Sequence, residues 1–91
     1  MTKRNKLLTR FLSRTVDFTW EELVTLMGHF GFVYRNDGGG SHGEFYNEEL
    51  DLLIKPATRP HGGKSVIKRY QMKQYKESLI AYGFIDLEED R

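Results

Sequence analysis

The fold of this chain is decided by residues 32–55, FVYRNDGGGSHGEFYNEELDLLIK. Residues 32–35 are β-branched and aromatic, and residues 42–46 alternate as a half-buried strand does. Residues 50–55 form a third apolar run, which we expect Pro56 to close because proline cannot donate to a strand ladder. The connections are short and rich in turn-forming residues, which excludes crossover helices between the strands. The segment therefore predicts three strands in an antiparallel meander.

A helix is expected immediately before these strands. Thr19-Trp20-Glu21-Glu22 has the form of a capping box, in which the threonine hydroxyl accepts a hydrogen bond from the third helical amide and the glutamate reaches back. Apolar residues then recur at helical spacing: Trp20, Leu23, Val24, Met27 and Phe30. Gly31 follows and suits a left-handed C-cap. The pattern predicts an amphipathic helix that ends just before the first strand.

A second helix is expected after the strands. Ser65 is its predicted N-cap and Gly83 its predicted end. One face is marked by Val66, Ile67, Tyr70, Gln74, Leu79 and Tyr82. The resulting order of helix, three antiparallel strands and helix predicts an α+β fold, a two-layer sandwich.

The length of 91 residues indicates a single domain over the whole chain. We expect residues 1–17 to be a basic N-terminal extension, with a short amphipathic helix at residues 6–13. Residues 18–85 form the predicted αβββα core, and residues 86–91 an acidic tail. No apolar run is long enough to span a bilayer, and the N-terminus lacks the features of a signal peptide, so we expect a cytoplasmic protein.

The net charge of +1 hides a strong segregation of charge along the chain. Residues 1–15 and 52–76 carry twelve lysines and arginines in all and no acidic residue. Such segments suit the binding of nucleic-acid phosphates, but solvated helix faces explain them equally well. The chain has no cysteine and its three histidines are scattered, so we expect neither a metal site nor another cofactor.

His42 is the candidate catalytic residue. It follows Gly39-Gly40-Ser41 at the start of an expected strand, where glycines let a phosphate approach closely. An imidazole transfers protons near neutral pH, and RNA supplies its own nucleophile in the 2′-hydroxyl, so one histidine and nearby cations suffice for cleavage. The alternative is an ordinary strand histidine whose ring bonds to a backbone carbonyl. On this strand His42, Glu44 and Tyr46 are expected on one face, and Gly43 and Phe45 on the other.

The chain resembles the HicA toxin family over about residues 18–84. The resemblance rests on Gly40-Ser41-His42 leading into Phe45-Tyr46, and on a loop with Pro60-His61 before a basic helix. A Trp20-Glu21-Glu22-Leu23 helix start and a Phe30-Gly31-Phe32 helix end precede them in the same order. No single tripeptide is specific, but their order and spacing together carry the similarity.

The resemblance implies a fold like that of double-stranded RNA-binding domains, cleavage of messenger RNA through His42, and a HicB-type antitoxin partner that blocks the site. It implies that Gly40 and Ser41 shape the approach to His42. From their charge we assign phosphate contacts to Lys64, Lys68 and Arg69, and we expect a monomer in the absence of antitoxin. Family members often carry polar or basic residues after the histidine, whereas Glu44 stands here, which would repel phosphate or raise the pKa of His42 if close to it.

Two other functions fit the same sequence. A non-catalytic module that binds double-stranded RNA has the same order of elements and a basic helix start, but gives the Gly-Gly-Ser-His run no purpose. A protein-interaction domain would instead recruit a partner through an exposed edge strand. A steep fall of RNA affinity with salt would distinguish the first from the second.

Overall fold

The structure is a computed structural model that describes residues 3–13, 17–36, 42–60 and 65–85. The elements are α1 (Lys3–Leu12), α2 (Trp20–His29), β1 (Phe32–Arg35), β2 (His42–Asn47), β3 (Leu52–Thr58) and α3 (Arg69–Ala81). The predicted α+β class, with a helix, a three-stranded antiparallel sheet and a helix, is confirmed. None of the described helices is long and apolar enough to cross a membrane.

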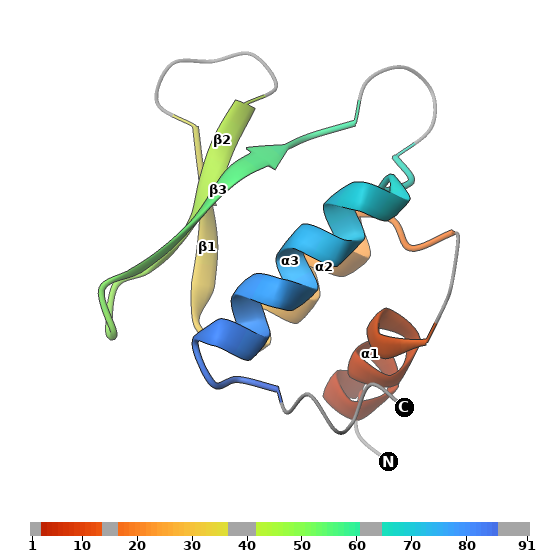
Figure 1. The fold of residues 1–91 in the computed structure, drawn as a ribbon, viewed down its shortest axis with the longest axis horizontal. Helices are drawn as coiled ribbons and strands as arrows, with labels where there is room; N and C mark the ends of the chain where they lie inside the picture. Colours follow the sequence, from red (N-terminus) through yellow and green to blue (C-terminus); the bar gives the residue numbers. More distant parts are fainter. Residues whose placement is uncertain (1–2, 14–16, 37–41, 61–64, 86–91) are drawn as a thin grey trace.

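The sheet has the order β1-β2-β3, and one of its faces packs on α2 and α3 (Figure 1). Phe45 in the central strand lies at the middle of this face, with Trp20 of α2 and Tyr75 of α3 against its ring at centroid distances of 5.6 and 5.9 Å. The face assignment predicted for β2 is confirmed, because Phe45 is fully buried while His42 is exposed. No described element covers the opposite face of the sheet, which therefore presents its side chains to solvent.

The predicted start and end of α2 are confirmed. Thr19 is the N-cap, and its hydroxyl and the Glu22 carboxylate form both hydrogen bonds of the capping box. Gly31 has a φ of +93°, the left-handed conformation that glycine adopts without strain. Close by, the buried Asn47 donates to the carbonyl of Phe30 at 2.9 Å and so ties the end of β2 to the end of this helix.

The prediction that Pro56 closes the third strand is wrong, because β3 continues to Thr58. Gly43 pairs with Ala57 and Phe45 with Ile54, so Glu44 alone stands opposite both Lys55 and Pro56. This is a β-bulge on an edge strand, the setting in which a sheet tolerates a residue without an N–H donor.

The prediction that Ser65 caps the last helix is also wrong, because α3 begins at Arg69. The residues before it extend alongside the start of α2: the carbonyl of Ser65 accepts from Trp20 at 2.6 Å, and Ile67 donates to the carbonyl of Phe18 at 2.8 Å. The later start changes which side chains face inward. Ile67 and Leu79 are buried as predicted, whereas Tyr70 and Tyr82 are exposed and Tyr75 fills the core.

The predicted N-terminal helix is present as α1, and it is part of the packed fold. Phe11 is buried and contacts Phe18 edge to face at 5.6 Å between centroids. Arg10 forms ion pairs with Asp17 and with Glu22 of α2. The N-terminal segment thus contributes to the hydrophobic core rather than extending away from it.

Candidate functional site

His42 is the first residue of β2. It pairs with Thr58 of β3, and the Thr58 hydroxyl oxygen lies 3.3 Å from Nδ1 of the imidazole. Among the described residues, no hydrogen bond to Nε2 is found. The contact with Thr58 therefore involves one of the two ring nitrogens.

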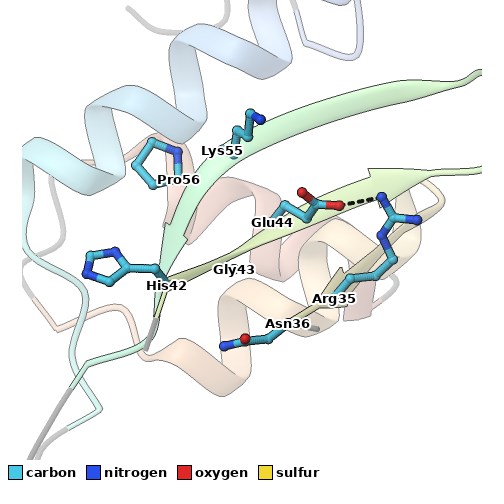
Figure 2. Close-up of a pocket in the computed structure, with 7 residues that line it drawn as sticks. All are labelled: Arg35, Asn36, His42, Gly43, Glu44, Lys55 and Pro56. Atoms are coloured by element: carbon cyan, nitrogen blue, oxygen red, sulfur yellow. Dashed lines mark hydrogen bonds and ion pairs between the residues drawn. The ribbon is translucent and has the colours of Figure 1, made fainter. Parts of the chain in front are cut away.

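Beside His42 the solvent-facing side of the sheet forms a hollow of about 540 Å³ (Figure 2). All three strands contribute to it, and its lining consists of Arg35, Asn36, His42, Gly43, Glu44, Lys55 and Pro56. A histidine, a carboxylate, a guanidinium and an ammonium group thus share one small concave surface. The His42 ring points away from Glu44, which lies deeper along the strand (Figure 2).

Arg35 and Glu44 form an ion pair across β1 and β2. The guanidinium of Arg35 also lies 4.0 Å from the centre of the Tyr46 ring, a cation–π contact on the same face. The Tyr46 hydroxyl donates to Asp51 at 3.0 Å, and this hydrogen bond is the main reason that the pKa of Tyr46 is raised. The Glu44 carboxylate, expected from the sequence to act on His42, is instead engaged by Arg35.

Gly43 forms the floor of the hollow next to His42. A Cβ at this position would lie 2.5 Å from the carbonyl oxygen of Arg35 and 2.6 Å from the hydroxyl of Tyr34. The Tyr34 hydroxyl also accepts a hydrogen bond from the Asn36 amide at 3.1 Å. Because a side chain would collide with backbone here, only glycine lets β1 and β2 approach this closely beside the histidine.

Tyr75 of α3 lies in the core, where its ring contacts Phe45 of β2. It is 2% exposed, and burial raises its pKa to about 12 against a smaller opposing effect of the Thr58 backbone. The phenol therefore stays neutral at physiological pH.

The structure brings together only part of the predicted site. Lys68 and Arg69 are exposed at the start of α3 and do not line the hollow. Gly40, Ser41 and Lys64 lie outside the described residues, as does His61. His29 is exposed at the end of α2, on a different element from the hollow.

Two cations of the hollow were missed as site residues. Lys55 was counted only within a basic segment, and Arg35 only as the end of a strand. The alternation of β1 and β2 could have placed Arg35 on the solvent-facing side together with His42 and Glu44. The bulge opposite Glu44 determines where Lys55 lies, and no sequence signal located it.

Comparison of this chain with models of protein families, with curated proteins and with solved structures found no match. The chemistry of the site therefore rests on its own residues. The arrangement offers a proton-transferring imidazole and a carboxylate, with two cations that can neutralise a phosphate.

Proposed function

We propose that this protein is a ribonuclease toxin in which His42 transfers protons during cleavage of RNA. The observation that carries the proposal is the position of His42, exposed at the rim of a hollow that also holds Arg35 and Lys55. An imidazole that is open to solvent and shares a hollow with two cations is suited to the cleavage of a phosphodiester by its own 2′-hydroxyl.

In the proposed reaction the ribose 2′-oxygen attacks the adjacent phosphorus and the bond to the 5′-oxygen breaks. His42 transfers a proton at one of these oxygens, a contribution of about 10²- to 10⁴-fold in rate. Arg35 and Lys55 stabilise the negative charge of the pentacovalent phosphorane. The products are a 2′,3′-cyclic phosphate and a 5′-hydroxyl, and no step needs a metal ion.

The resemblance to the HicA family adds a biological setting to this chemistry. In that setting the substrate is messenger RNA, and a HicB-type antitoxin binds the toxin and blocks the hollow. Gly40 and Ser41 shape the approach to His42, while Lys64, Lys68 and Arg69 contact phosphates further along the strand. These roles belong to the proposal together with the catalytic one.

The test is cleavage of a long single-stranded RNA in EDTA by wild-type protein and by the variants His42→Ala and His29→Ala. We expect the wild type and His29→Ala to cut, and His42→Ala to lose at least 10² in rate while its RNA affinity stays unchanged. His29 is a matched control because it is exposed and lies outside the hollow. Equal cleavage by all three proteins would overturn the assignment of His42.

A non-catalytic RNA-binding module remains a second candidate, favoured by one observation. Lys68 and Arg69 are exposed at the start of α3, apart from the hollow, so they are free to contact a duplex backbone without any chemistry at His42. Salt-sensitive binding of duplex RNA by both wild type and His42→Ala, with no cleavage by either, would establish this function instead.

A further inference from the structure

We propose that Glu44 is the second proton-transferring residue of the hollow, accepting the proton of the attacking 2′-hydroxyl while His42 protonates the leaving 5′-oxygen. The inference rests on the proposed ribonuclease function and deepens it. It gives a role to the residue that departs from the pattern of the HicA family, which the sequence alone suggested would repel the substrate.

Glu44 and His42 contribute side chains to the same hollow from one strand. His42 and Glu44 are two residues apart on β2, so they share a face and their Cα atoms are about 7 Å apart. Both line the hollow, and in Figure 2 their side chains diverge, with the ring at the rim and the carboxylate further in. A phosphodiester that spans the hollow would meet the carboxylate at one end and the imidazole at the other.

The carboxylate of Glu44 is held in position rather than free to rotate. Arg35 pairs with it, and the guanidinium is itself fixed over the ring of Tyr46. About a quarter of the Glu44 side chain is accessible (26%), which leaves it reachable by a substrate. Positioned groups of this kind are the ones that contribute to proton transfer.

The charges around Glu44 still favour the binding of a phosphate group in the hollow. The charged and titratable groups around it are Arg35 from β1, Lys55 from β3, and His42 and Tyr46 on its own strand. Two permanent cations therefore outnumber the one carboxylate, and a protonated His42 adds a third positive charge. The anionic substrate is attracted to the hollow as a whole although one of its walls is acidic.

The proposed step is balanced in atoms and protons. The Glu44 carboxylate takes the proton of the 2′-hydroxyl as the 2′-oxygen forms its bond to phosphorus. The bond from phosphorus to the 5′-oxygen then breaks, and the imidazolium of His42 gives its proton to that oxygen. Proton exchange with water returns Glu44 to the carboxylate and His42 to the imidazolium.

The experiment measures kcat/KM on a fluorogenic single-stranded RNA across pH, in EDTA, for wild type, Glu44→Gln, Arg35→Gln and Glu48→Gln. Glu48→Gln is the matched control, since it removes the same charge from an exposed position at the other end of the β2–β3 hairpin. Thermal unfolding of each variant establishes that it is folded.

We expect a bell-shaped profile for the wild type, with an acidic limb from Glu44 and an alkaline limb from His42. Glu44→Gln should lose about 10² to 10⁴ in rate and also lose the acidic limb, while Glu48→Gln keeps both rate and limb. Arg35→Gln should lower the rate but keep the acidic limb.

An acidic limb that persists in Glu44→Gln, or a rate within threefold of wild type, overturns the role of Glu44 even if His42→Ala is inactive. Equal losses in Glu44→Gln and Arg35→Gln with unchanged profiles would mean that Glu44 only holds Arg35, which overturns it as well. Failure of the wild type to cleave any RNA overturns the proposed function and this inference together.

Discussion

The two ends of β2 differ in the burial and the hydrogen bonding of their polar side chains. At one end Asn47 is 2% exposed, and its amide bonds within the protein: it donates to the carbonyl of Phe30 at 2.9 Å and accepts from Leu50 N–H at 3.0 Å. At the other end His42 is exposed, and it shares a hollow with charged side chains from all three strands. Polar groups buried at the first end stabilise the fold, whereas those at the second face solvent and are available to a ligand.

Gly43 bears on both the stability of the sheet and the shape of the hollow. Its substitution should therefore have the largest effect on stability and RNA cleavage taken together. Gly43→Ala places a methyl group 2.5 Å from the carbonyl oxygen of Arg35, and the strands must separate to admit it. We expect a loss of about 3 kcal/mol in the free energy of unfolding, measured with urea, and a fall in RNA cleavage, because His42 and Glu44 move with the strand.

Gly28→Ala is the control for this substitution. Gly28 lies in α2 with no atom within 4 Å of an added Cβ, so alanine there should leave stability unchanged or slightly raised. If Gly43→Ala were as stable and as active as Gly28→Ala, the close approach of β1 and β2 would have no role.

The sequence was sufficient to predict the helix ends that depend only on neighbouring residues. The capping box at Thr19 and the left-handed Gly31 were both predicted, because their hydrogen bonds and dihedral angles involve only neighbouring residues. It was insufficient to predict where β3 ends and where α3 begins. Whether a strand continues through Pro56 depends on the bulge opposite Glu44, and whether Ser65 caps a helix depends on the competing pairing with Trp20.

The residues of the candidate site also differ in whether neighbouring residues in the sequence were enough to predict them. His42 was found from its own neighbours in the sequence, the preceding glycines and serine. Arg35 and Lys55 were missed because they line the hollow with His42 only through the register of three strands. The roles of Lys68 and Arg69 were inferred from local charge, and the structure places these residues on another element, away from the hollow.

A substitution at the buried end of β2 should affect stability alone. Asn47→Ala removes the hydrogen bonds of the side-chain amide with the Phe30 carbonyl and the Leu50 N–H, which should cost about 2 kcal/mol of unfolding free energy. The rate of RNA cleavage by the folded fraction should remain that of the wild type. A large loss of activity without a loss of stability would contradict the separation of the two ends.

The smallest expected effect is at Thr58, and it should appear in activity alone. Thr58→Val keeps the shape of the side chain but removes the hydroxyl beside Nδ1 of His42. A lost hydrogen bond of about 1 kcal/mol corresponds to about a fivefold lower kcat, with KM and unfolding free energy little changed. Thr58→Ser should restore the rate, and an equally slow Thr58→Ser variant would exclude the hydroxyl as the cause.

The most direct test of His42 as the catalytic residue is to identify the RNA ends that the wild-type protein and His42→Ala produce in EDTA. We expect fragments with a 2′,3′-cyclic phosphate and a 5′-hydroxyl from the wild type and none from the variant. Fragments with a 3′-hydroxyl and a 5′-phosphate, or the same fragments from both proteins, would contradict the assignment of the hollow at His42 as the site of RNA cleavage.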